Sequence, residues 1–130
     1  MGPALVAVAC GDAATRELLL RVVERAGFAP TPVEVTTSDI SGLTGPVDAG
    51  ATLAVLDLDA AAPAVIDAIR AHPASAVSGL RVVVLADGAA VGRRAWAAGA
   101  DGFLDRPFHH DRLVATLRDV RDRPEAAREP

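Results

Sequence analysis

The sequence predicts an α/β fold in which a doubly wound parallel β-sheet of five strands is covered by helices on both faces. Apolar segments of strand length alternate with amphipathic segments of helix length along the 130 residues. Several strand segments are apolar at every position, which is typical of parallel strands buried on both faces. Hydrophobic residues make up 51% of the chain, enough for one domain with a substantial core.

The first strand and helix are predicted near the start of the chain. Residues 4–10 form a continuous apolar run of strand length. The segment 12–28 places leucines and valines at helical spacing, with Asp12 suited to the N-cap and Gly27 to the end. Residues 32–37 alternate in polarity, so we expect a short second strand there.

The middle of the chain predicts a loop followed by two strands with a helix between them. Residues 38–51 are rich in Gly, Ser and Thr, so we expect mostly loop, with a weak helix around 39–43. The apolar runs 52–57 and 81–86 predict buried strands. Pro63 suits the first turn of the intervening helix. The buried face of that helix is expected to contain Val65, Ile66 and Ile69.

The last third of the chain predicts a helix over 89–98, a strand over 102–105 and a helix over 110–123. The expected core contacts of the first of these helices are Val91, Ala95 and Trp96. Those of the last helix are Leu113, Val114, Leu117 and Val120. The domain is therefore expected to span 1–123, and residues 124–130 to form a frayed tail or linker.

Several polar residues follow the predicted strands directly. In a parallel sheet the carboxyl ends of the strands meet at one edge, where binding and catalytic groups gather. The strand LAVLD ends on Asp57, and a buried carboxylate needs a partner, a metal ion or access to water. The other residues expected at this edge are Cys10, Gly11, Asp12, Asp59, Ala86, Asp87 and Arg106.

Four segments carry a resemblance to a known family. They are the VLD that ends at Asp57, RVVVLA at 81–86, AAGADGFLDRPF at 97–108 and ERAGF at 24–28. Over residues 4–122 the chain resembles the receiver (CheY-like) domain of bacterial two-component response regulators. The resemblance implies a flavodoxin-like three-layer sandwich with strand order 2-1-3-4-5. It also implies a cytoplasmic phosphoprotein of a phosphorelay, which receives its phosphoryl group from a histidine kinase.

The resemblance also implies roles for individual residues at the strand ends. Asp57 matches the phospho-acceptor, and Arg106 stands where the family has a lysine that binds phosphoryl oxygens. Ala86 stands at the position of the family's Thr or Ser, and Phe103 at that of an aromatic switch residue. All thirteen basic residues are Arg, so no lysine elsewhere in the chain can replace the missing one.

The Mg²⁺ site of the family is matched only in part. The acidic pair that follows the first strand falls on Cys10 and Gly11, and Asp12 comes one residue later. The candidate ligands for Mg²⁺ are Asp12, Asp57 and Asp59. Charge accounting favours the alternative of a metal-free pocket in which Arg106 neutralises Asp57, because a guanidinium can bind a carboxylate through two parallel hydrogen bonds.

Three functions remain open from the sequence, and none of them is an enzyme activity. In the first, a response-regulator receiver accepts a phosphoryl group at Asp57 and signals through the face formed by 89–98, 102–105 and 110–123. In the second, a pseudo-receiver is not phosphorylated and serves as a docking or dimerisation module. In the third, a flavodoxin-like domain binds a small molecule at the same sheet edge.

Composition and charge narrow the expected partners. The formal net charge is −4 and no basic stripe occurs, so this segment is not expected to contact nucleic acid directly. No apolar run reaches the length of about eighteen residues that a membrane span needs. The single cysteine, Cys10, fits a reducing cytoplasm. The expected partners are a histidine kinase or another signalling protein, a second copy of the chain and a tethered output domain.

Overall fold

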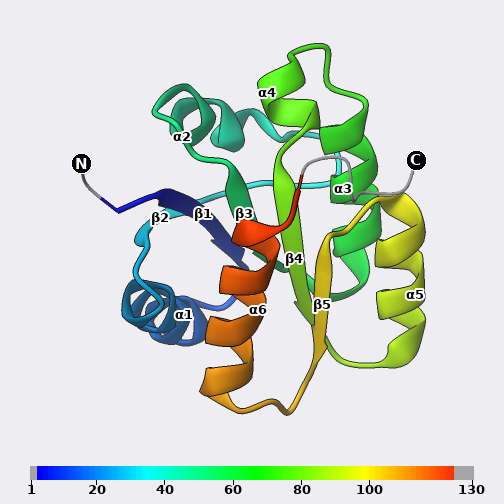
Figure 1. Ribbon diagram of the computed structural model, residues 1–130. Coiled ribbons are helices and arrows are strands. Elements are labelled where there is room, and N and C mark those ends of the chain that lie inside the picture. The colour runs from blue at the N-terminus through cyan, green and yellow to red at the C-terminus, as the bar shows by residue number, and fades with distance from the viewer. Residues whose placement is uncertain (1–2, 125–130) are drawn as a thin grey trace.

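A computed structural model describes residues 3–124 and shows one parallel sheet with strand order β2-β1-β3-β4-β5 (Figure 1). Every neighbouring pair of strands runs parallel. The strands are β1 (Leu5–Cys10), β2 (Ala29–Val33), β3 (Leu53–Asp57), β4 (Arg81–Ala86) and β5 (Gly102–Asp105). The fold class and the strand order are therefore confirmed.

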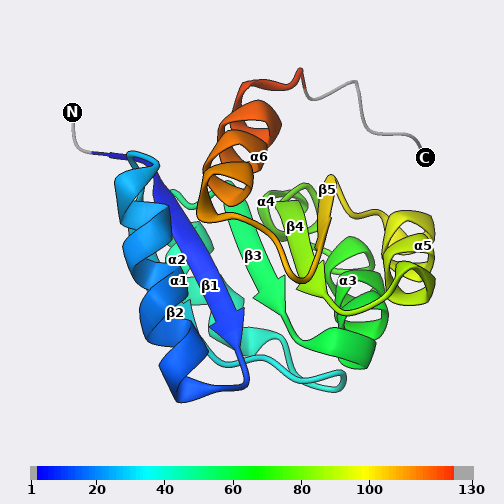
Figure 2. The same ribbon diagram turned by 90° about the horizontal axis from the view of Figure 1, so that it is seen from below.

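Helices cover both faces of this sheet (Figure 2). The four longer ones are α1 (Ala13–Arg25), α3 (Ala62–Arg70), α5 (Ala89–Ala98) and α6 (His110–Asp122). The shorter ones are α2 (Thr44–Asp48), α4 (Ser75–Ser78) and the 3₁₀ turns η1 (Ser41–Leu43) and η2 (Asp59–Ala61). The helices α1 and α6 pack on one face, and α2 to α5 pack on the other. In the part of the chain described, no helix is long and apolar enough to cross a bilayer.

The core forms two layers, one on each side of the sheet. Alternate residues of β1 enter opposite layers: Ala7 and Ala9 belong to the layer on the side of α2 to α5, whereas Val6 and Val8 belong to the layer on the side of α1 and α6. The strand β3 is buried at every position, which explains its uninterrupted apolar sequence. Buried as predicted are Val65, Ile66, Ile69, Ala95, Leu113, Leu117 and Val120, with Val91 and Val114 partly buried against them.

The strand β2 lies three residues earlier than expected. It was predicted over 32–37, but it spans Ala29–Val33 and includes Pro30 and Pro32. The strand lies at the edge of the sheet and pairs only with β1. The amide of Ala29 donates to the carbonyl of Ala4 on the β1 side, so the alternate positions 30 and 32 turn their nitrogens away from β1. Proline is tolerated there because no ladder hydrogen bond is lost.

Three further expectations are corrected by the structure. The segment 38–51 contains η1 and α2, so its helical part begins within the predicted 39–43 but extends on to Asp48. The short helix α4 was not expected from its sequence. Trp96 is 49% exposed and does not belong to the core, because the inward face of α5 is taken by Gly92 and Ala95. The tail predicted at 124–130 lies outside the described residues except for Pro124.

A polar network fastens the end of α3 to the segment that precedes β5. The guanidinium of Arg70 donates to the carbonyl of Gly99 through Nε at 3.2 Å and through Nη2 at 2.6 Å. Its Nη2 also lies 3.1 Å from Oδ2 of Asp101, a carboxylate that is almost fully buried. The same Oδ2 accepts the amide of Val82 in β4 at 2.9 Å. Further acceptors of the Arg70 guanidinium are the carbonyls of Ser78 and Leu80.

Candidate functional site

The carboxyl ends of β1, β3 and β5 meet at a cavity of about 450 Å³. Cys10, Asp57 and Arg106 line it, and they come from these three ends. Asp57 and Cys10 are also register partners across the β1–β3 pair, which brings their side chains together. The cavity therefore lies at the carboxyl-terminal edge of the sheet, where the sequence predicts the functional residues.

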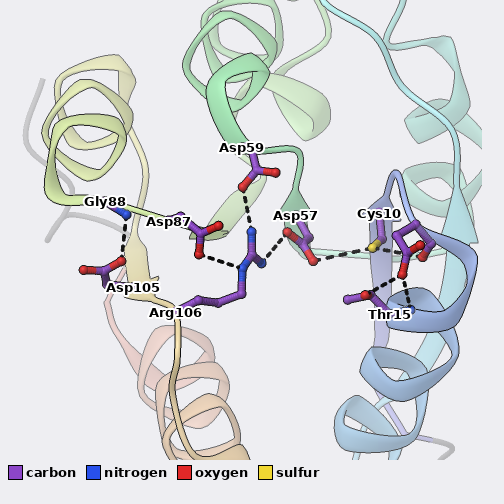
Figure 3. A network of polar contacts seen from close by, with 9 residues as sticks. Cys10, Thr15, Asp57, Asp59, Asp87, Gly88, Asp105 and Arg106 are labelled. Atoms are coloured by element: carbon purple, nitrogen blue, oxygen red, sulfur yellow. Dashed lines mark hydrogen bonds and ion pairs between the residues drawn. The ribbon is translucent and has the colours of Figure 1, made fainter.

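Asp57 is the last residue of β3, and its side chain is only 7% exposed. Its Oδ1 accepts a hydrogen bond from Nη1 of Arg106 at 2.6 Å (Figure 3). Its Oδ2 lies 3.5 Å from Sγ of Cys10, whose thiol donates to it. The predicted contact between Asp57 and Arg106 is thus present, and the buried carboxylate has a cationic partner.

The guanidinium of Arg106 binds three carboxylates, not one. Its Nη2 lies 2.6 Å from Oδ1 of Asp59, and its Nε lies 3.2 Å from Oδ1 of Asp87 (Figure 3). The expected pair of parallel hydrogen bonds to Asp57 is therefore absent, because each nitrogen reaches a different carboxylate. We call Arg106, Asp57, Asp59 and Asp87 the arginine clamp. A planar guanidinium suits it because its donors point in several directions within one plane.

Electrostatics in the arginine clamp favour the charged guanidinium. Burial acts to lower the pKa of Arg106, but the hydrogen bond and charge of Asp57, with the charges of Asp59 and Asp87, outweigh burial and raise it. The side chains of Asp59 and Asp87 are 65% and 75% exposed, so water screens their charges. The Asp57–Arg106 contact is the part of the clamp that is shielded from solvent.

The local backbone brings the members of the clamp together. Asp59 has a φ of 48°, in the left-handed region, and is the first residue of η2, where the chain turns away from β3. At the end of β5, the amide of Arg106 donates to the carbonyl of Ala86 at 3.0 Å. Oδ1 of Asp105 accepts the amide of Gly88 at 2.8 Å (Figure 3). The end of β5 is thereby tied to the turn between β4 and α5.

The acid that follows β1, Asp12, already has hydrogen-bond partners for its carboxylate. Asp12 is the N-cap of α1, and its Oδ2 accepts the amide of Thr15 at 2.8 Å and the hydroxyl of Thr15 at 2.6 Å. These two hydrogen bonds lower the pKa of Asp12. Burial raises the pKa of the Cys10 thiol, and the charge of Asp57 raises it further. Cys10 therefore stays protonated, as expected of a small buried side chain.

Sequence reasoning missed one cation at this edge. Nη2 of Arg16, from the first turn of α1, donates to the carbonyl of Cys10 at 2.9 Å. The position of Arg16 one turn after the N-cap was the available signal, since such a side chain can reach back to the strand end. With Arg16 and Arg106, two guanidinium groups come near the end of β1 and the end of β3.

The residues at this edge do not fit Mg²⁺. Asp12 caps α1, whereas Asp59 is bound by Arg106, so the predicted ligands Asp12, Asp57 and Asp59 do not converge on one point. Across residues 3–124, no three side chains of His, Cys, Asp or Glu form a group that could hold a metal ion. The space beside Asp57 suits a guanidinium, and the first strand contributes a thiol and a glycine in place of oxygen ligands.

Ala86 and Phe103 occupy the places that the sequence predicted for them. Ala86 ends β4, is fully buried and brings a methyl group to the strand end. Phe103 in β5 is partly buried against α5. A Cβ atom built on Gly92 would lie only 2.6 Å from Cε2 of Phe103, so the ring packs directly on the backbone of α5. Its role as a switch stays a prediction.

We expect Gly92→Ala to lower the free energy of unfolding by about 1–3 kcal/mol, because the new methyl group must displace the Phe103 ring. Urea unfolding followed by circular dichroism measures the change. Gly45→Ala is the matched control, since nothing lies within 4 Å of a Cβ atom there. Equal stability of the two variants would show that the Phe103 ring is not confined by Gly92.

Comparison with solved structures gives the same fold. The receiver domain of a response regulator from Bermanella marisrubri superposes with a TM-score of 0.75 at 21% identity, covering 91% of this chain and 98% of that chain. Chemotaxis protein CheY4 of Vibrio cholerae gives 0.73 at 18% identity, with coverage of 92% and 99%. The orphan response regulator HP1043 of H. pylori gives 0.69 at 17% identity, with coverage of 92% and 97%.

The chain therefore has the fold of CheY-like response regulator receiver domains. No family model matches the sequence, and no curated protein matches it. At identities of 17–21%, the fold is shared while the residues at the strand ends must be considered on their own chemistry.

Proposed function

We propose that the protein is a receiver-fold signalling domain that acts by binding other proteins and does not accept a phosphoryl group at Asp57. It corresponds to the pseudo-receiver alternative, a docking module and not an enzyme. The observation that supports it most directly is the 2.6 Å contact between Nη1 of Arg106 and Oδ1 of Asp57. This contact already satisfies the carboxylate that would have to attack the phosphoryl donor.

The surroundings of Asp57 are poorly suited to an added phosphoryl group. Such a group brings a charge of about −1.5 to −2 and needs cations and hydrogen-bond donors close by. Arg106 is shared with Asp59 and Asp87, which add negative charge next to the site. The methyl group of Ala86 offers no hydrogen bond. Phosphorylation here would place three or four negative charges around one guanidinium.

The face formed by α5, β5 and α6 is the proposed contact surface. Trp96 on α5 is one of two large hydrophobic side chains that are exposed in the described part of the chain; the other is Leu18 on α1. Tryptophan and arginine are enriched in the energetically important parts of protein interfaces. Arg93 and Arg94 on α5 are exposed beside Trp96 in the sequence. This combination supports a protein partner with an apolar patch and acidic groups.

The proposed partners are signalling proteins such as a histidine kinase, a second copy of the chain or an output domain joined to it. The proposed location is the cytoplasm, in keeping with the single reduced cysteine. No direct contact with nucleic acid is proposed, given the net charge of −4.

Treatment with acetyl phosphate and Mg²⁺, followed by intact-mass measurement, tests the proposal. We expect no mass increase of one phosphoryl group, and no change in Trp96 fluorescence with beryllofluoride. A phosphorylatable receiver domain treated in parallel is the positive control. A phosphoryl adduct on the wild-type protein that disappears in Asp57→Asn would contradict the proposal and restore the phospho-acceptor function.

A further inference from the structure

We propose that Arg106 is the permanent cation of the strand-end site and occupies the place between carboxylates that a divalent metal ion would need. This inference goes beyond the proposed function, because it concerns metal binding and not phosphorylation or docking. Metal binding is measured by Tm and NMR, and phosphorylation by intact mass. The proposed function and this inference can therefore be disproved independently.

The first support is the geometry of the arginine clamp. Its guanidinium is in contact with oxygens from three separate segments: the end of β3, the start of η2 and the turn after β4. A bound Mg²⁺ or Ca²⁺ places its oxygen ligands at about 2.0–2.6 Å. An ion placed between Asp57 and Asp59 would compete for Oδ1 of each, which already receive the guanidinium at 2.6 Å. It would also lie next to the positive charge of Arg106, which repels it.

The second support is the balance of charge in the buried part of the site. Only Asp57 is shielded from water, and Arg106 supplies one positive charge for its one negative charge. The side chains of Asp59 and Asp87 are mostly exposed, so water screens their charges. They would therefore stabilise a further cation only weakly. The guanidinium stays protonated at any physiological pH. Being part of the chain, it does not dissociate as a metal ion does.

The third support is the set of groups on the other side of Asp57. Oδ2 of Asp57 faces the thiol of Cys10, not an oxygen ligand. The carboxylate of Asp12 is held by Thr15 at the start of α1. The carbonyl of Cys10 accepts a hydrogen bond from the guanidinium of Arg16. A divalent ion beside Asp57 would lack ligands from the first strand and would face a second positive charge.

The test compares the response to Mn²⁺ in wild type and in Arg106→Met, with ionic strength held constant. We expect the Tm of the wild-type protein to be unchanged by millimolar Mn²⁺. Arg106→Met opens the position between Asp57, Asp59 and Asp87, so Mn²⁺ is expected to raise its Tm by about 4 °C or more. Arg21→Met removes the same charge from an exposed pair on α1 and is expected to respond like wild type.

A second measurement keeps the inference testable if Arg106→Met does not fold. Mn²⁺ broadens the NMR signals of nearby amides, and the wild-type amides of Asp57 and Asp59 are expected to stay sharp. Specific broadening at these two amides in the wild-type protein would overturn the inference. It would also be overturned if a folded Arg106→Met responded to Mn²⁺ no more than Arg21→Met does.

Discussion

Arg70→Met is expected to lower the free energy of unfolding by about 3 kcal/mol or more, the range measured when one partner of a buried ion pair is removed. The substitution keeps most of the length and the apolar stem of the side chain. It removes the charge next to Asp101, which is buried, and the donors to the carbonyls of Gly99, Ser78 and Leu80. Buried acceptors that lose a charged donor are costly, so the effect should exceed that of a surface pair.

Chemical unfolding in urea, at equal protein concentration and pH, measures this loss. Arg21→Met is the matched control, because its partner Glu17 lies 3.9 Å away and both side chains are 74% exposed. We expect the control to change stability by less than about 1 kcal/mol. If both variants lost the same stability, the Arg70 network would not be a main contributor to the fold.

Arg106→Met is expected to have the second largest effect, a loss of about 2–3 kcal/mol in stability without added metal. The carboxylate of Asp57 would lose its guanidinium while remaining mostly buried at the end of β3. The loss should be smaller than that of Arg70→Met because the cavity beside Asp57 admits water, which can solvate the carboxylate.

The double variant Asp57→Asn/Arg106→Met separates the charge from the packing. Removing both charges should recover most of the stability that Arg106→Met loses, because no buried carboxylate is left uncompensated and the exposed Asp59 and Asp87 are solvated by water. Unfolding curves for the wild-type protein, both single variants and the double variant give the coupling between Asp57 and Arg106. Additive effects in this cycle would mean that the 2.6 Å contact contributes nothing to stability.

Most of the fold could be predicted from the sequence because its strands are buried on both faces. β3 is apolar from Leu53 to Leu56, and β4 is apolar from Val82 to Ala86. Such short continuous runs bounded by polar residues are assigned as strands by their length and their β-branched content. The strand β2 was misplaced because an edge strand needs less apolar surface and accepts Pro30 and Pro32. The exposure of Trp96 was missed because a large apolar residue on a helix is usually taken as core.

The candidate site was predictable only at its centre. Asp57 ends β3 and Arg106 directly follows β5, and the carboxyl ends of all strands of a parallel sheet lie at the same edge. The positions of Asp59 and Asp87 depend on turns, including the left-handed conformation of Asp59, and no periodic pattern encodes a turn of that kind. The side chains of both acids are mostly exposed, and both also bind Arg106.

The prolines of β2 also limit how copies of this protein can associate. An unprotected sheet edge presents free amide donors that can recruit a strand from another molecule, which leads to aggregation. At Pro30 and Pro32 the outward-facing positions carry no N–H group. A strand from another molecule would find carbonyl acceptors on β2 but not the amide donors that a complete ladder needs. Self-association through the β2 edge of the sheet is therefore disfavoured.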